Sequence, residues 1–369
     1  MITHFSRLKN GTVLLLMHIT LSLFSFSFLP LFLHKNGYPY YVLVLPSVLF
    51  AGFGALFISL IRTYNLRTFI CLGYACFALM ALSLFFHVSY YSIFIYSVLL
   101  ALALVFYWIP INYVFFHASS TSTNALDSSV YMASSGFLSI FVPLGGALVI
   151  KHGGFSWLFG LTALFYLIPL FFAARKISPV TITLPLSDGI REFKRLRTIT
   201  FLEGSLHFFV GTIIPIYTLL FLNTELKFGS FLGYLGLLGS IAAFLFSYHS
   251  DKTQKRLSYL TLLFAAMALC SLLFIFIDAV SSWLMVVGLF TMLSTISSPL
   301  RLAVSLDVKK ADLHFWKVRE LFLNIGRFVT LLIAMIFFYF QLYWPVFVMF
   351  GLIYLLYPLL VKYKLKEVK

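Results

Sequence analysis

Residues 13–33 of this 369-residue chain read VLLLMHITLSLFSFSFLPLFL, without one Asp, Glu, Lys or Arg. A helix needs about 20 such residues to cross the hydrocarbon core of a bilayer. Lipid offers the backbone no hydrogen bonds, so this run must form a helix or a strand of a closed barrel. Barrel strands alternate polar and apolar residues over about ten positions, which this run does not do. A transmembrane helix is therefore expected here.

Comparable apolar runs follow one another along the whole sequence. Hydrophobic residues make up 62% of the chain and charged residues 10%, and the mean hydropathy is +1.01. Soluble domains carry about 25% charged residues because water surrounds them. The sequence thus predicts an all-α integral membrane protein with about twelve transmembrane helices. We expect spans at 11–34, 40–61, 68–88, 91–115, 129–150, 154–174, 200–223, 229–248, 257–278, 282–303, 319–340 and 342–362.

Basic residues gather on one side of these predicted spans. If the N-terminus is cytoplasmic, the loops on the far side contain only Lys35, Lys151 and Lys227. Nearly all other Lys and Arg fall in cytoplasmic loops, and these include Arg301 and Lys317. Such a bias is typical of loops that stay on the cytoplasmic side. We therefore expect a multi-pass protein of the cell membrane (inner or plasma membrane) with both termini cytoplasmic, attracting anionic lipids rather than nucleic acid.

The longest internal connection divides the chain into two parts. We expect an N-terminal six-helix bundle over 1–176, a cytoplasmic linker over 177–199 and a C-terminal six-helix bundle over 200–369. Within the linker, apolar residues alternate with basic ones at helical spacing, which predicts an amphipathic helix at the membrane surface. A plain connecting segment is the alternative.

The two predicted halves share the spacing of their helix-bending residues. Pro110 and Pro299 are 189 positions apart, as are Pro169 and Pro358. Prolines mark places where helices bend, so a common spacing implies a common architecture. Six spans per half place both halves in the membrane in the same sense, and repeats of this kind hold substrate between them near the midplane.

This layout resembles the major facilitator superfamily over essentially the whole chain. The stretch Ser250–Arg256 is similar to the charged loop motif of that superfamily, although Ser247 and Gln254 stand where the motif has glycine. The corresponding first-half loop has Arg62 in place of the acid. The segment Gly136–Gly146 resembles the antiporter motif in part. The resemblance implies two six-helix bundles that rock about a central cleft.

Few charged side chains lie within the predicted spans, where a charge costs about 2.5–3.5 kcal/mol at a helix centre. Glu203 and His207 are four residues apart and share a helix face, as do Glu320 and Arg327 at a spacing of seven. A buried carboxylate and a neighbouring imidazole can both change charge near neutral pH, so the first pair is a candidate for proton coupling. Alternatively, Glu203 pairs with Arg327 or Arg319 and pins two helices together.

The resemblance also places the first and fourth spans of each half along the cleft. An aromatic ring and a few hydrogen-bonding groups in an apolar cleft are the usual composition of a small-molecule site. For each residue the alternative is ordinary helix packing or a hydrogen bond back to its own helix. The cleft residues implied are His18, Trp108, Asn112, His207, Ser294, Thr295 and Ser298.

The charged loop after the eighth span is expected to gate transport. A carboxylate near a helix N-terminus stabilises it by about 0.3–1 kcal/mol, and a contact made in one state only would shift the equilibrium between states. A solvated loop without such a role is the alternative. The gating residues expected are Asp251, Lys252, Arg256 and Glu320.

No catalytic or nucleotide-binding motif is found in the sequence. Cys71, Cys76 and Cys270 lie in apolar runs without metal-ligand spacing, so no cofactor or metal is expected. We therefore expect a monomeric secondary transporter of a small molecule, not an enzyme, with Glu203 and His207 as a hypothesis for proton coupling. A sensor or assembly factor of the same fold is the alternative, and a membrane-embedded enzyme or lipid flippase is a third.

Overall fold

A computed structural model describes most of the chain. The backbone is described over residues 2–86, 88–116, 124–183, 186–250, 256–308 and 312–366. Side chains are described over 11–86, 88–114, 136–183, 186–243, 257–302, 304–305, 308 and 312–364.

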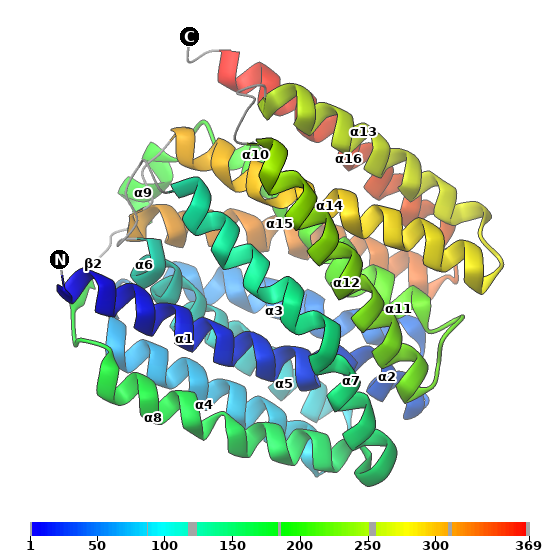
Figure 1. The fold of residues 1–369 in the computed structure, drawn as a ribbon, viewed down its shortest axis with the longest axis horizontal. Helices are drawn as coiled ribbons and strands as arrows, with labels where there is room; N and C mark the ends of the chain where they lie inside the picture. The colour runs from blue at the N-terminus through cyan, green and yellow to red at the C-terminus, as the bar shows by residue number, and fades with distance from the viewer. Residues whose placement is uncertain are drawn as a thin grey trace.

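Helices account for nearly all of these residues (Figure 1). The first group comprises α1 (Ile2–Ser25), α2 (Leu29–Lys35), α3 (Tyr40–Leu60), α4 (Leu66–Phe85), α5 (Tyr90–Ala103), α6 (Ile109–Phe116), α7 (Asn124–Phe165) and α8 (Leu167–Lys176). The second group comprises α9 (Leu186–Glu192), α10 (Arg197–Phe208), α11 (Ile214–Thr218), α12 (Glu225–Ser250), α13 (Arg256–Leu273), α14 (Val280–Val308), α15 (Leu313–Tyr339) and α16 (Trp344–Lys366).

Eleven helical stretches within the described residues are long and apolar enough to cross a membrane. They follow the expected spans closely, from Gly11–Lys35 to Trp344–Lys364. The expected fifth and sixth spans fall in one stretch of 41 residues, Gly136–Lys176. Gly154 interrupts that stretch with φ of 77° and ψ of 178°, a conformation open to glycine because it lacks a Cβ. Figure 1 shows the chain turning back after this part of α7, so that α8 packs beside α4.

Three helices lose regular geometry just before a proline. A 3₁₀ turn at Phe26–Phe28 precedes Pro30, and π-helical segments at Leu104–Trp108 and Phe209–Ile213 precede Pro110 and Pro215. Proline has no N–H, and its ring collides with the carbonyl four residues earlier. A change in the width of the preceding turn relieves that collision. Both π-helical segments continue into the same tripeptide, Ile-Pro-Ile, and such segments are frequent at functional sites.

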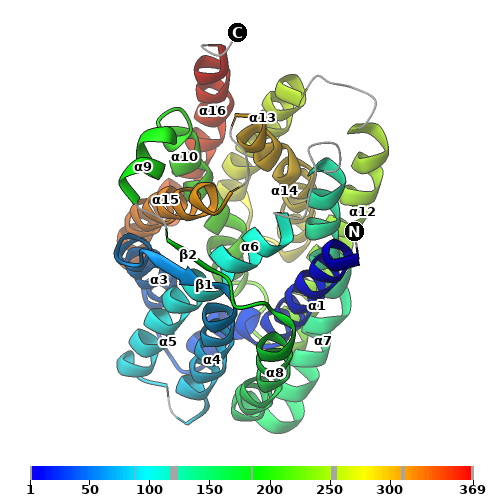
Figure 2. The ribbon, with the colours of Figure 1, turned by 90° about the vertical axis from the view of Figure 1, so that its left-hand side faces the viewer.

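The start of α1 and the end of α16 lie at the same end of the molecule (Figure 1). The short strands β1 (Thr63–Asn65) and β2 (Thr181–Thr183) pair antiparallel there, with Tyr64 opposite Ile182. Figure 2 looks onto this end and shows α1, α4, α5 and α8 in the lower part of the view, with α10, α13, α14 and α16 in the upper part.

The connection between α8 and α10 packs against α15. Phe193 and Leu196, two of the apolar residues in the expected amphipathic helix, follow the end of α9 and are buried. The Phe193 ring lies 5.8 Å from Phe315 and stacks on Phe322 at 6.1 Å, both on α15. This apolar side therefore contacts a neighbouring helix.

The two groups of helices contact each other chiefly through α3 against α15 and through α7 against α12. At one end, Lys35 Nζ donates to Glu225 Oε1 at 2.6 Å. At the opposite end, where β1 lies, Lys317 Nζ donates to the carbonyl oxygen of Ile61 at 2.6 Å. A lysine of α15 thus binds the C-terminal end of α3, where helix carbonyls carry partial negative charge.

Candidate functional site

The candidate site is built where α10 packs against α15. A Cβ on Gly204 would overlap the carbonyl of Leu323, and a Cβ on Gly326 would overlap the carbonyl of Phe201. Ser205 Oγ donates to the Gly326 carbonyl at 3.3 Å. Small residues allow helix backbones to approach closely inside a membrane. The charged neighbours of both glycines are thereby brought face to face.

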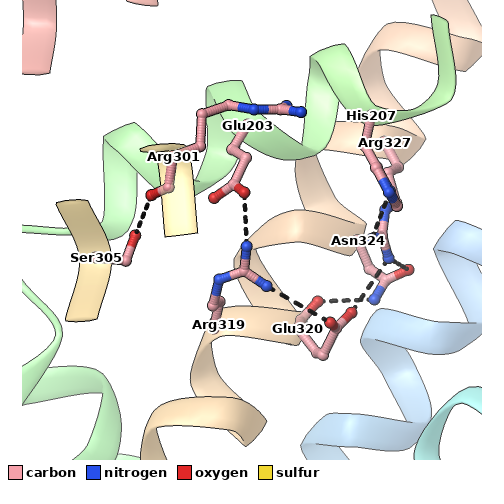
Figure 3. Close-up of polar contacts among 8 residues, drawn as sticks. All are labelled: Glu203, His207, Arg301, Ser305, Arg319, Glu320, Asn324 and Arg327. Atoms are coloured by element: carbon pink, nitrogen blue, oxygen red, sulfur yellow. Dashed lines mark hydrogen bonds and ion pairs between the residues drawn. The ribbon is translucent and has the colours of Figure 1, made fainter. Parts of the chain in front are cut away.

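Four of these charged side chains form a row in which bases and acids alternate (Figure 3). Arg319 Nη2 donates to Glu203 Oε1 at 2.6 Å, and Arg319 Nη1 lies 3.9 Å from Glu320 Oε1. Arg327 Nη1 in turn donates to Glu320 Oε2 at 3.2 Å. All four residues are buried. Mutual pairing offsets the cost of placing each charge inside the membrane.

His207 closes the row at its far end. Arg327 Nη2 lies 3.0 Å from His207 Nδ1. Because an arginine can only donate, Nδ1 must accept, and the neutral ring then carries its proton on Nε2. Arg327 Nη1 also donates to Asn324 Oδ1 at 3.3 Å, and Asn324 Nδ2 donates to the carbonyl of Glu320 at 2.7 Å.

The expected pair of Glu203 and His207 is therefore divided between two arginines of α15. The two residues share a face of α10, as their spacing requires, yet each side chain contacts a different partner: Arg319 holds Glu203, and Arg327 holds His207. Glu320, expected as a gating residue, lies between the two arginines as the shared acid.

Two cations were counted with the cytoplasmic loops, although Arg301 falls near the end of the expected span 282–303, and that assignment to loops was wrong. Arg301 and Lys317 are 7% and 1% exposed. Both lie within helices because α14 continues to Val308 and α15 already begins at Leu313. Figure 3 shows Arg301 reaching over α10 beside Glu203. A sequence signal for Arg301 exists, since Ser294, Ser298 and Arg301 are spaced to share one face of α14.

The first half contributes an aromatic cluster around His18. The His18 ring lies 4.3 Å from Phe77, 4.6 Å from Tyr107 and 5.2 Å from Trp108, centroid to centroid. Tyr166 Oη lies 3.3 Å from His18 Nδ1. His18 is buried. The structure thus brings together His18 and Trp108, two of the expected cleft residues, and adds three aromatic partners that spacing alone did not reveal.

The other expected cleft residues lie on the helices assigned to them. Asn112 is buried on α6. Ser294, Thr295 and Ser298 are partly exposed on α14, and Thr295 Oγ1 lies close to Gly239 of α12. No described hydrogen bond joins these three residues to His18 or to the charged row.

Three of the expected gating residues lie where side chains are not described. Asp251 and Lys252 fall outside the described residues, and Arg256 begins α13 without a described side chain. Their gating role stays a prediction.

The packed apolar helices define a multi-pass membrane protein, and the comparison of sequences gives its family. The family model described as Major Facilitator Superfamily matches residues 13–312. The chain belongs to the major facilitator superfamily. No curated protein matches it.

Solved structures of transporters share this fold. The human organic anion transporter MFSD10 (TETRAN) is 12% identical, with 97% of this chain and 99% of that chain covered and a TM-score of 0.67. A POT family transporter in complex with a thioalcohol-conjugated peptide is 11% identical, with 97% and 96% covered and a TM-score of 0.70. A POT family transporter in complex with 5-aminolevulinic acid is 12% identical, with 97% and 96% covered and a TM-score of 0.72. At these identities the likeness shows the fold.

Proposed function

We propose that this protein is a secondary active transporter that moves a small molecule by alternating access. Its halves are residues 1–176 and 200–369, joined by the linker 177–199, with twelve crossings and both termini cytoplasmic. One observation carries the proposal: a π-helical segment occurs in each half, beside residues expected to line the cleft. Trp108 ends one π-helical segment, and His207 lies just before the other. Such segments inside helices are frequent at functional sites.

The charged row suggests how protons would drive the cycle. Arg319 lies between Glu203 at 2.6 Å and Glu320 at 3.9 Å. A proton on Glu203 would neutralise that carboxylate and free Arg319 to approach Glu320. Arg319 would then compete with Arg327 for the Glu320 carboxylate. Arg327 would loosen its bond to His207 in turn. Glu203 and His207, the two groups expected to take the proton, thus lie at opposite ends of one chain of contacts.

Proton coupling is tested in proteoliposomes that contain a trapped pH dye. The solutes offered are those that raise the melting temperature of the purified protein, because a ligand stabilises the state it binds. We expect solute-driven proton movement in the wild type and in Glu225→Gln, the control, and none in Glu203→Gln. Equal proton movement in Glu203→Gln would end the coupling proposal. Absence of solute movement in the wild type would favour a sensor.

The ligands named for the similar structures all contain an acidic group or can carry one. They are an organic anion for the human transporter, and a peptide and 5-aminolevulinic acid for the POT family structures. We take these only as a guide to the solutes to be offered first.

A further inference from the structure

Among the side chains that the structure describes, the charged region of α10, α14 and α15 contains one more cation than anion. Arg301, Arg319 and Arg327 are the guanidinium groups of this region, and Glu203 and Glu320 are its carboxylates. Lys317 lies apart, bound to the end of α3. A guanidinium group keeps its proton in a protein, so these described side chains leave one positive charge that an entering anion would neutralise.

Arg301 is the guanidinium group of this region for which the described residues supply no partner. Among the described residues it forms no ion pair, and its Nε, like those of Arg319 and Arg327, has no hydrogen-bond partner; Arg301 is 7% exposed. Glu203 Oε1 is taken by Arg319. Glu203 Oε2 also lacks a partner, but Arg301 does not lie within ion-pair distance of it. A charge buried without a partner is among the costliest features a protein can keep.

A second unused donor lies close to Arg301. His207 Nε2 carries a proton, by the argument from its Arg327 contact, and no described group accepts it. Figure 3 shows the Arg301 side chain reaching over α10, the helix that carries His207. His207 is exposed although its neighbours from Glu203 to Leu206 are buried. One turn further along the same helix, a Cβ on Gly211 would meet open space.

We propose that Arg301 and His207 form the docking point for the carboxylate of a monoanionic organic substrate. The planar fork of arginine matches the two oxygens of a carboxylate. A single negative charge would neutralise the excess on this region, and Ser294 and Ser298 continue the polar face of α14 beyond Arg301. This inference names the substrate class of the proposed transporter and in that sense rests on the proposed function.

The test is thermal unfolding of the purified protein in a neutral detergent. The probes are benzoate and hexanoate, with benzamide and hexanamide as neutral counterparts of the same shape. We expect both carboxylates, and neither amide, to raise the melting temperature. Arg301→Gln should weaken carboxylate binding about 10- to 100-fold, the range expected for losing a charge-assisted hydrogen bond. Arg67→Gln, which removes an arginine bonded to the Ile177 carbonyl, should leave binding unchanged.

The same variants separate a binding role from a structural one. Without ligand, Arg301→Gln should melt at a higher temperature than the wild type, because it removes an unpaired charge and leaves no carboxylate alone. Arg301→Lys should fold and retain part of the binding. A lower melting temperature or failure to fold in Arg301→Gln, or a carboxylate effect that survives it, would overturn the proposal.

Two further outcomes are informative. In one outcome, the wild type melts at a higher temperature in phosphatidylglycerol nanodiscs than in phosphatidylcholine nanodiscs, and Arg301→Gln does not. That result would assign Arg301 to a lipid phosphate and refute the substrate site. Because binding is measured without a gradient, carboxylate binding without transport would refute only the proposed function. Transport without any carboxylate binding would refute only the inference.

Discussion

The ion pair between Glu203 and Arg319 gives the most demanding prediction. Glu203→Gln removes the carboxylate at 2.6 Å from Arg319 and leaves Glu320 at 3.9 Å. With an effective dielectric constant of about 20, these separations correspond to gross attractions of about 6 and about 4 kcal/mol. Breaking a buried pair costs about 3–5 kcal/mol. Because Glu320 keeps part of the attraction, we expect a loss near the lower end, about 3 kcal/mol.

The reverse substitution should cost less. Arg319→Gln leaves Glu203 alone, and a carboxylate can take up a proton and become neutral, whereas an arginine cannot lose its proton. The double variant Glu203→Gln with Arg319→Gln should recover about 2 kcal/mol relative to the sum of the single effects, since neither charge is left unpaired.

The assay is thermal unfolding of the three variants in detergent. With 369 residues and an unfolding entropy of about 2.1 cal/mol/K per residue, a loss of 3 kcal/mol corresponds to a shift of about 4 °C. Strictly additive single effects would refute the pairing. A larger loss of stability for Arg319→Gln than for Glu203→Gln would refute the reasoning that an unpaired arginine costs more than an unpaired carboxylate because it cannot lose its charge.

Three further substitutions test the packing around the site. Gly326→Ala should cost about 1–3 kcal/mol or more because its methyl group collides with α10, while Gly211→Ala, facing open space, should be tolerated in the same unfolding assay; equal effects would refute the close approach. Lys317→Met should cost about 1–3 kcal/mol by leaving the last carbonyl of α3 without its partner, and an unchanged melting temperature would argue against that contact. Lys35→Ala should cost less than about 1 kcal/mol because its bond to Glu225 is exposed, and a cost above 2 kcal/mol would show that this pair holds the halves together.

The membrane-crossing helices could be predicted from sequence because one physical constraint dominates them. Each apolar run must satisfy its own backbone, so length and composition nearly determine its limits, as the close match at Tyr40–Leu60 illustrates. Proline positions indicated the irregular segments before Pro30, Pro110 and Pro215, whereas Pro46, Pro299 and Pro358 lie inside α-helices. The turn at Gly154, a glycine with positive φ, falls at the first residue of the expected sixth span.

The partners inside the site could not be predicted in the same way. Helical spacing places Glu203 and His207 on one face but does not specify which residues of α15 face them. That choice depends on the register set by Gly204 and Gly326, which is a property of the packed pair of helices. Arg301 and Lys317 were missed for a different reason: charges near the ends of apolar runs resemble loop residues until the helix limits are known.

The account depends on two halves that move against each other, and paired distance measurements test this most directly. Spin labels would be placed at the exposed positions Asn36 and Asn223, near the Lys35–Glu225 contact, and at Thr63 and Ser258 at the opposite end, in a variant without its three cysteines. On addition of a stabilising solute or on a change of pH, we expect one distance to increase while the other decreases. Two distances that stay fixed, or that change in the same direction, would contradict alternating access.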